Sequence, residues 1–216
     1  MDKFENIKKC LFIKMEDYTE QKEKSSLRKK ADNAKKMRCS TLICVLENPK
    51  NINNVSSVVR NIDALGIGKL YVVDGFNLLP KGHWKESMRN DKNLSNISVS
   101  AIKWTYVRRF DTTKSCIDHI KKDGFLSMVT SPHLKGKDNF DLHEGNFTQK
   151  KLAVWFGNES CGISDEAIKE SIGCIQIEMG GIVESLNLSV STGIVLHQIA
   201  TRRRKFIEEK LINRVQ

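Results

Sequence analysis

Short apolar runs alternate with stretches of helical periodicity along most of this chain. Apolar runs that end in polar or turn-forming residues are typical of strands buried on both faces of a parallel sheet. Such runs occur at residues 41–46, 70–73, 105–107, 125–130, 152–156 and 174–177. The intervening stretches predict helices at 55–65, at 112–122 and after Ser164, and a long helix from about Ser185 through a basic run. About six strands that alternate with helices indicate a doubly wound α/β domain.

The first forty residues differ in composition from the rest. Apolar residues at helical spacing predict an amphipathic helix within residues 1–20: Phe4, Ile7, Leu11, Met15 and Tyr18. Residues 21–38 are polar and basic, which fits either an exposed helix or arm, or an extension that grips RNA. We therefore divide the chain into a basic helical extension, 1–40, and a main domain, 41–216.

Two stretches of the main domain lack clear periodicity. Residues 75–98 are rich in glycine and asparagine and predict a long loop with a short helix near residues 84–88. Residues 134–150 are polar and predict a linker that leads into the run at 152–156.

Charge and cysteine content narrow the classes of function. The net charge is +10 and the sequence pI is about 9.3, which is typical of proteins that meet nucleic acid but also of a solvated lysine-rich surface. The six cysteines form no C-x-x-C pair and no Cys/His metal spacing, so we expect reduced thiols and no metal. No apolar run approaches the ~20 residues that span a bilayer, and the N-terminus lacks a signal-peptide core. We therefore expect a cytoplasmic protein without a membrane partner.

Polar residues cluster where three of the predicted strands end. Asn54 and Arg60 follow the first strand, Glu159 follows the fifth, and Ser185 and Asn187 follow the last. Ligands of open α/β sheets bind outside the carboxyl ends of the strands. We therefore expect a ligand site there, where Glu159 can accept a hydrogen bond from Arg60 or bind a ribose.

Three short motifs contain these residues: Asn54-Val-Ser-Ser-Val-Val-Arg60, Gly157-Asn158-Glu159 with Gly162, and Glu184-Ser185-Leu186-Asn187-Leu188-Ser189-Val190. In this order and spacing they resemble the signature motifs of the SpoU (TrmH) ribose methyltransferases, which belong to the SPOUT superfamily. An asparagine six residues before an arginine carries almost no information alone, but three motifs in order make the resemblance specific. It covers roughly residues 42–204.

The resemblance implies a fold and a cofactor. The fold is a SPOUT-type α/β domain, with a mostly parallel sheet flanked by helices, whose last segments thread a preceding loop as a trefoil knot. The cofactor is S-adenosylmethionine, held by loops at 130–131, 157–158 and 177–186. The expected cofactor-binding residues are Thr130, Gly157, Ile177, Met179 and Leu186. SPOUT enzymes are usually homodimers, and the first and last helices are the candidate interface.

The resemblance also makes five residues candidates for catalysis: Asn54, Arg60, Glu159, Ser185 and Asn187. Arg60 is the expected catalytic residue, either as a general base or as a fixed cation beside the developing alkoxide. A guanidinium keeps its proton above pH ~12, so the second role is chemically easier. Without the motifs, Asn54 and Ser185 are ordinary cap or turn residues, Glu159 is a loop acid and Arg60 forms a surface ion pair.

These observations predict methylation of a ribose 2′-hydroxyl in RNA, with a guanosine of tRNA favoured. Residues 1–40 are too short and polar for the separate RNA-binding domain of many ribosomal-RNA members. The chain departs from the family pattern before Met179, where relatives commonly have a proline, and its C-terminal basic helix lacks the longer tail of some tRNA-specific members. The alternatives are the same reaction on 23S ribosomal RNA, a non-catalytic RNA-binding module, and a nicotinamide-linked enzyme, which the missing G-x-G-x-x-G disfavours.

Overall fold

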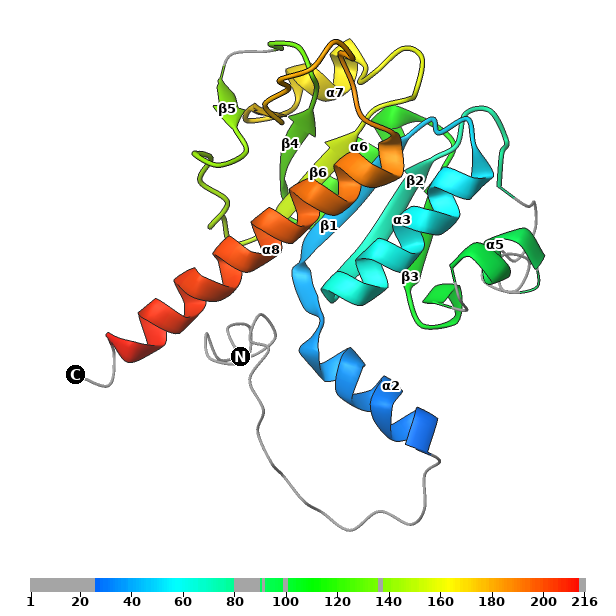
Figure 1. The fold of residues 1–216 in the computed structure, drawn as a ribbon, viewed down its shortest axis with the longest axis vertical. Coiled ribbons are helices and arrows are strands. Elements are labelled where there is room, and N and C mark those ends of the chain that lie inside the picture. The colour runs from blue at the N-terminus through cyan, green and yellow to red at the C-terminus, as the bar shows by residue number, and fades with distance from the viewer. Residues whose placement is uncertain (1–25, 80–89, 91, 99–100, 136–137, 214–216) are drawn as a thin grey trace.

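The computed structural model describes residues 26–79, 90, 92–98, 101–135 and 138–213 (Figure 1). They contain a sheet of seven strands in the order β3-β2-β1-β6-β4-β7-β5. The strands are β1 Cys39–Glu47, β2 Ile67–Val73, β3 Tyr106–Phe110, β4 Leu126–Thr130, β5 Asn139–Asp141, β6 Leu152–Phe156 and β7 Cys174–Gln176. All neighbouring strands run parallel, so their carboxyl ends lie at one edge of the sheet.

Six of these strands lie where the apolar runs predict them, and the seventh, β5, falls in the stretch predicted as a linker. It has only three residues and pairs with β7 at the border of the sheet. The carbonyl of Asp138 accepts from the Cys174 amide at 2.7 Å, and the Leu142 amide donates to the Gln176 carbonyl at 2.9 Å. These bonds depend on a distant strand, which is why local periodicity does not predict β5.

Helices cover both faces of the sheet. They are α2 Ser26–Met37, α3 Ile52–Leu65, α5 Lys92–Ile97, α6 Thr113–Lys122, α7 Asp165–Lys169 and α8 Leu188–Ile212, with a short 3-10 turn, η1, at Ala101–Lys103. The helices α3 and α8 lie side by side on one face (Figure 1). Leu42 and Cys44 of β1 join the core under α3 and α8, whereas Ile43 and Val45 join the core under α6 and α7. Cover on both faces explains why β1 is apolar at successive positions.

Local capping accounts for most helix ends. Asn51 caps the N-terminus of α3, because its side chain accepts a backbone amide of the first turn at 2.8 Å. The helix ends as predicted at Gly66, whose φ of 68° lies in the left-handed region that glycine adopts without strain. Thr112 caps α6, and Ser164 caps α7 as predicted.

Some expectations concern segments of which the structure describes little. The helix predicted within residues 1–20 and the one near residues 84–88 lie outside the described residues. Part of the basic segment 21–38 is the helix α2, and α5 lies within the stretch predicted as a loop. In the described part of the chain, no helix is long and apolar enough to cross a membrane.

One arginine of the basic run in α8 is buried and joins this helix to the segment before β6. Arg203 is only 6% exposed. Its guanidinium donates to the carbonyls of Phe147 at 2.8 Å and Gln149 at 2.6 Å, and to the hydroxyl of Thr41 at 2.9 Å. These bonds link the last helix to β1 and to residues 147–150.

We expect Arg203→Ala to lower the free energy of unfolding by roughly 3 kcal/mol, because buried acceptors lose charged donors. The matched control is Lys205→Ala on the exposed side of the same helix, which should change stability by less than about 0.5 kcal/mol. Urea unfolding followed by circular dichroism measures both. Equal stability of the two variants would contradict a structural role for Arg203.

Candidate active site

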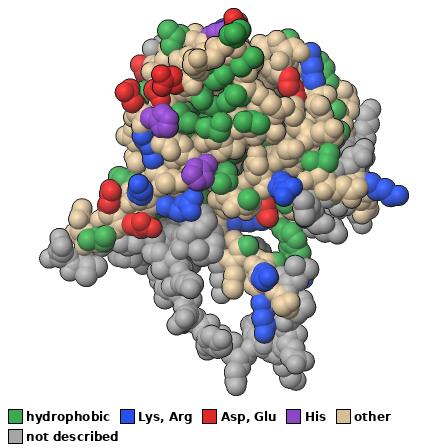
Figure 2. Space-filling model, viewed as in Figure 1, with side chains coloured by type: hydrophobic (Ala, Val, Ile, Leu, Met, Phe, Trp, Pro, Cys, Tyr) green, Lys and Arg blue, Asp and Glu red, His purple; other side chains and the backbone are tan. Residues whose placement is uncertain are grey.

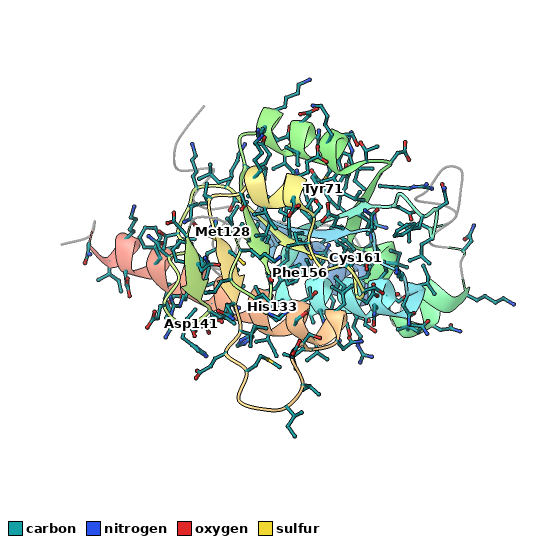
Figure 3. All side chains as sticks on the ribbon, turned by 90° about the horizontal axis from the view of Figure 1, so that it is seen from above. Tyr71, Met128, His133, Asp141, Phe156 and Cys161 are labelled. Carbon is teal, nitrogen blue, oxygen red and sulfur yellow. The ribbon has the colours of Figure 1, made fainter. Side chains whose placement is uncertain are left out.

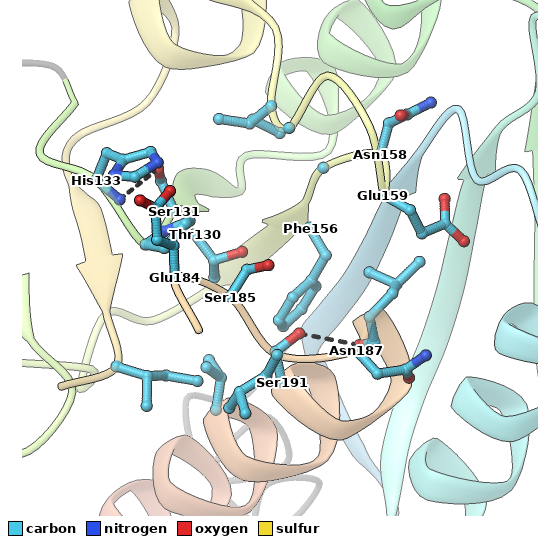
Figure 4. Close-up of a pocket in the computed structure, with 18 of the residues that line it drawn as sticks. Thr130, Ser131, His133, Phe156, Asn158, Glu159, Glu184, Ser185, Asn187 and Ser191 are labelled. Carbon is cyan, nitrogen blue, oxygen red and sulfur yellow. Dashed lines mark hydrogen bonds between the residues drawn. The ribbon is translucent and has the colours of Figure 1, made fainter. Parts of the chain in front are cut away.

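A cavity of about 530 Å³ lies outside the carboxyl ends of β4, β6 and β7. Its walls come from residues 130–135, from 156–163, from the segment between β7 and α8, and from the first turns of α8. Figure 4 shows Glu159 and Asn187 at one side of this cavity and Ser131 and His133 at the other. Seen down onto this edge of the sheet, Phe156, His133 and Cys161 lie near the centre (Figure 3).

All five residues predicted to bind the cofactor line this cavity: Thr130, Gly157, Ile177, Met179 and Leu186. Thr130 also donates its hydroxyl to the Trp155 carbonyl at 2.9 Å, which ties the end of β4 to β6. The tertiary structure thus brings the three predicted loops together around one space.

The loop after β6 is folded back on itself. The amide of Asn158 donates to the carbonyl of Gly162 at 2.9 Å, and the amide of Gly162 donates to the carbonyl of Asn158 at 2.9 Å. A Cβ atom on Gly157 would lie 2.2 Å from the carbonyl carbon of Gly162, so only glycine fits there. Gly162 itself has a φ of 69°.

The Asn158 side chain holds the loop from inside. Its Oδ1 accepts the amides of Ser160 at 2.7 Å and Cys161 at 3.0 Å, and its Nδ2 donates to the carbonyl of Asn48 at 2.7 Å. Asn158 is buried. It therefore fixes the shape of the loop that carries Glu159.

A chain of hydrogen bonds joins the three sequence motifs. The Asn187 Nδ2 donates to Asn54 Oδ1 at 3.1 Å, and Asn54 Nδ2 donates to Glu159 Oε1 at 2.7 Å. The backbone amide of Lys50 donates to the other Glu159 oxygen at 2.9 Å. Residues more than 100 positions apart in sequence thus meet at the rim of the cavity.

These bonds set the charge state of Glu159. Partial burial opposes its ionisation, but hydrogen bonds from the Asn54 side chain and the Lys50 amide outweigh this, and the net effect lowers the pKa of Glu159 below its usual value. A carboxylate with a lowered pKa and both oxygens engaged is a poor proton acceptor. Glu159 therefore suits an anchoring role better than that of a general base.

The lowered pKa predicts a pH-dependent stability. Because the folded pKa lies below the unfolded value of about 4.3, the contribution of Glu159 is fully present above about pH 5.5 and is lost as the pH falls through the folded pKa. The stability difference between the wild type and Glu159→Gln should therefore shrink below about pH 4. Thermal unfolding from pH 3 to pH 7 measures it, with exposed Glu178→Gln as the control. A difference that stays constant to pH 3 would contradict the assignment.

The start of the last helix corrects the prediction for Ser185. The helix α8 begins at Leu188 and not near Ser185. Asn187 occupies the capping position, with its Oδ1 accepting from the Ser189 amide at 2.8 Å and the Ser189 hydroxyl at 2.7 Å. Ser185 is exposed on the preceding loop and lines the cavity. Its side chain is therefore available to a ligand.

Arg60 is not part of this network. It lies in α3 six residues after Asn54, a rotation of about 240° around the helix axis if each residue turns ~100°. Its side chain is exposed, does not line the cavity, and forms no hydrogen bond or ion pair with another described residue. Of the two roles considered for Glu159, the bond from Arg60 is not formed in the structure, and Asn54 and the Lys50 amide are the donors to that carboxylate. Asn61, on the Asn54 side of α3, instead donates to the Ser189 carbonyl at 2.9 Å.

Sequence reasoning missed a buried acid behind the site. Glu47, 2% exposed, ends β1. It accepts from the Ser164 amide at 2.8 Å, the Ser164 hydroxyl at 2.6 Å and the Thr113 hydroxyl at 2.6 Å. It thereby ties the far end of the Gly157 loop to β1. An acid directly after an apolar run was the only signal in the sequence.

Three charged or titratable residues at the cavity were also not predicted. His133 and Lys135 follow β4, and Glu184 opens the third motif. Their positions directly after a predicted strand or within a motif were the available signals.

Comparison with known proteins decides the family. A model of the SpoU rRNA Methylase family matches residues 41–197. The chain belongs to this family. The prediction drawn from the three motifs is therefore confirmed, together with the SPOUT-type α/β fold class and the assignment to RNA methyltransferases.

Several relatives match most of the SpoU-family domain. A tRNA (guanosine(18)-2′-O)-methyltransferase from Thermus thermophilus is 29% identical over 178 residues, covering 82% of this chain and 84% of the relative. An enzyme of the same name from Borreliella burgdorferi is 27% identical over 180 residues, covering 83% of this chain and 75% of the relative. The crystal structure of the A. aeolicus TrmH/SpoU tRNA modifying enzyme has a TM-score of 0.67 at 28% identity, covering 83% of this chain and 84% of that one.

A more distant structure supports the fold alone. The SpoU methyltransferase AviRb from Streptomyces viridochromogenes, solved in complex with the cofactor AdoMet, has a TM-score of 0.62 at 20% identity and covers 76% of this chain and 61% of that one.

Proposed function

We propose that this protein transfers a methyl group from S-adenosylmethionine to the ribose 2′-hydroxyl of a guanosine in tRNA. The observation that carries the proposal is the hydrogen-bonded chain Asn187–Asn54–Glu159, which joins the three family motifs at the rim of the cavity. Relatives named tRNA (guanosine(18)-2′-O)-methyltransferases favour tRNA and make nucleotide 18 the first position to examine.

The cavity suits S-adenosylmethionine, whose bound form supplies an electrophilic methyl group. Its volume of about 530 Å³ lies within the ~300–1,000 Å³ typical of cofactor sites. Apolar Ile177, Met179 and Leu186 offer surface to an adenine, and the tightly folded loop at Gly157 offers backbone atoms. Thr130 completes the set of residues that we assign to the cofactor.

The rim residues then have distinct roles in the reaction. Asn54 and Asn187 are held by each other, and Glu159 holds Asn54 in one orientation. We assign to these three the positioning of the target ribose, with exposed Ser185 beside them. Arg60, whose guanidinium has no partner among the described residues, is the cation that stabilises the developing alkoxide or holds a phosphate.

An apolar surface beside the site fits a homodimer. The loop before α8 exposes Ile182 fully and Val183 at 66%, and the first turns of α8 expose Val190 and Ile194 at 48% and 41%. Figure 2 shows hydrophobic side chains gathered on this face. Apolar patches of this kind mark protein interfaces, and Val190 and Ile194 are four residues apart on one side of the helix. The second copy would bury the face formed by α8, one of the two helices expected at the interface.

The basic extension, residues 1–40, is assigned to RNA binding. Arg28, Lys29 and Lys30 are exposed on α2. Removing residues 1–37 should weaken RNA binding and flatten its salt dependence, because phosphate contacts are lost. Unchanged RNA affinity and an unchanged salt slope would show that the extension does not contribute to RNA binding.

The function is tested by methyl transfer from labelled S-adenosylmethionine to tRNA and to ribosomal RNA, each lacking its natural modifications, followed by nuclease mapping. A 2′-O-methylguanosine in tRNA is the expected result. Label in ribosomal RNA alone would support the proposed methyl transfer but contradict the assignment of tRNA as the substrate.

Cofactor binding is tested separately through Cys161, which lines the cavity and is the only exposed cysteine in the described part of the chain. In a Cys10→Ser background, S-adenosylmethionine should slow alkylation of Cys161. Alkylation at an unchanged rate with saturating cofactor would place the cofactor elsewhere.

A further inference from the structure

Three cations on the α6 side of the sheet are held by aromatic rings. The Lys69 ammonium lies 6.0 Å from the ring centroid of Tyr106 and 5.8 Å from that of Phe125. The Lys151 ammonium lies 5.3 Å from the Phe125 ring, and the Arg108 guanidinium lies 5.0 Å from a neighbouring ring. Among the residues that the structure describes, none of these cations forms an ion pair with a carboxylate. The rings orient the cations without neutralising their charge.

These residues gather near the amino ends of the strands. Lys69 lies opposite Tyr106 in the register of β2 and β3, and Lys151 immediately precedes β6. We call Lys69, Tyr106, Arg108, Phe125 and Lys151 the amino-end surface. The cavity lies at the carboxyl ends, and Lys151 lies five residues before Phe156, which lines it. At ~3.3 Å per residue, Lys151 and the cavity are about 16 Å apart along β6.

A histidine of α6 lies next to this surface, and the charges of the surface act on its pKa. The Nε2 of His119, on α6, lies 3.0 Å from an Arg108 nitrogen and 3.5 Å from a carboxylate oxygen of Asp123. Burial lowers the pKa of His119, and the charges of Arg108, Lys69 and Lys122 lower it further, against the opposing effect of Asp123. The cations of this surface thus lower the pKa of His119 in the same direction as burial, and Asp123 acts against them.

The remaining acids of α6 and of the segment after α7 do not offset the amino-end surface. Asp118 pairs with Lys114 at 2.8 Å, and Glu170 pairs with Lys121. Each acid is thus balanced by a lysine outside the amino-end surface.

We infer that the amino-end surface binds the phosphate backbone of the substrate RNA, away from the nucleotide that is methylated. This inference rests on the proposed function. Lysine and arginine that keep their charge are phosphate ligands, and the Tyr106 ring, 38% exposed, offers a face to a base or ribose. A folded RNA of the size of tRNA is large enough to contact both regions at once.

The test compares a double variant, Lys69→Gln with Lys151→Gln, with a control, Lys114→Gln with Lys121→Gln, whose lysines are paired with acids. Each is titrated against an unmodified full-length tRNA transcript and against the short stem-loop that carries the mapped nucleotide, over a range of salt concentrations. For the full-length transcript, the double variant should bind about tenfold more weakly, with a log–log salt slope smaller by about two, one for each lost lysine. Binding of the stem-loop and S-adenosylmethionine affinity should not change. Lys69→Arg with Lys151→Arg should restore the affinity and the slope.

The outcomes separate this inference from the proposed function. A full-length wild-type chain that binds S-adenosylmethionine but no RNA would refute the proposed substrate class itself. If both double variants bind RNA with the same salt slope, the proposed role of the amino-end surface in RNA binding is wrong, but the proposed function is not affected. Equal weakening on the stem-loop would also overturn it, because the contact would then lie beside the methylated nucleotide. Loss of binding to anionic vesicles, with tRNA binding unchanged, would assign the surface to a membrane instead.

Discussion

Replacing Gly157 by alanine should abolish cofactor binding and lower the free energy of unfolding by about 3 kcal/mol. The added Cβ would lie 2.2 Å from the carbonyl carbon of Gly162, 2.3 Å from the Ile163 nitrogen and 2.5 Å from the Gly162 oxygen. All three are backbone atoms of a loop closed by two hydrogen bonds, so they cannot move aside cheaply. Opening this loop would displace the wall of the cavity and the neighbouring Glu159.

The matched control for stability is Gly180→Ala, in the exposed loop after β7. No atom lies within 4 Å of a Cβ built at Gly180, and this residue does not have a positive φ. Isothermal titration with S-adenosylmethionine and urea unfolding measure the two effects. Full cofactor affinity in Gly157→Ala would mean that the Gly157 loop does not form the cofactor site.

Replacing Arg60 by alanine should slow methyl transfer by about 10²- to 10³-fold, the loss typical of removing one group that stabilises a developing oxyanion. Affinity for S-adenosylmethionine and thermal stability should stay at wild-type values, because the Arg60 side chain is exposed and does not line the cavity. Single-turnover kinetics with saturating tRNA measure the chemical step. A wild-type rate would remove Arg60 from the mechanism.

A second substitution separates the possible roles of Arg60. Lysine keeps the positive charge but lacks the planar fork that holds a phosphate with two bonds. If Arg60 acts as a point charge beside the alkoxide, Arg60→Lys should recover most of the rate. If Arg60 clamps a phosphate, the lysine variant should show weaker RNA binding and a slow rate at subsaturating RNA. Lys205→Ala, on the exposed side of α8, controls for a general loss of positive charge.

Helices and strands could be predicted where consecutive residues encode them, and could not where they depend on residues far away in the sequence. The run 152–156 is apolar at every position because β6 is covered on both faces, and Ser164 caps α7 because a serine hydroxyl accepts the amide of Ala167. Both features leave a pattern in consecutive residues that can be recognised in the sequence. The strand β5, by contrast, exists because β7 has an open edge at which backbone groups pair. No local pattern encodes that edge.

The candidate site divides in the same way. The three motifs identify Asn54, Glu159 and Asn187 as a group, because residue type and spacing are properties of the sequence. Their order in space, with Asn54 between the other two, is set by the approach of α3, the Gly157 loop and the start of α8. In the same packing, Asn54 and the Lys50 amide donate to the Glu159 carboxylate and Arg60 does not. The spacing of the motifs alone does not reveal this result.

The sequence by itself determined the alternation of strands and helices, the positive charge, and the residue types available for methyl transfer, since each is a local or summed property. The tertiary structure decided which of those residues meet. It buried Arg203 and Glu47 as links between distant segments, and it left Arg60 exposed. It also placed Lys69 and Lys151 on aromatic rings. Such choices depend on contacts between residues far apart in the chain, where helix rotation and strand pairing set each side chain's surroundings.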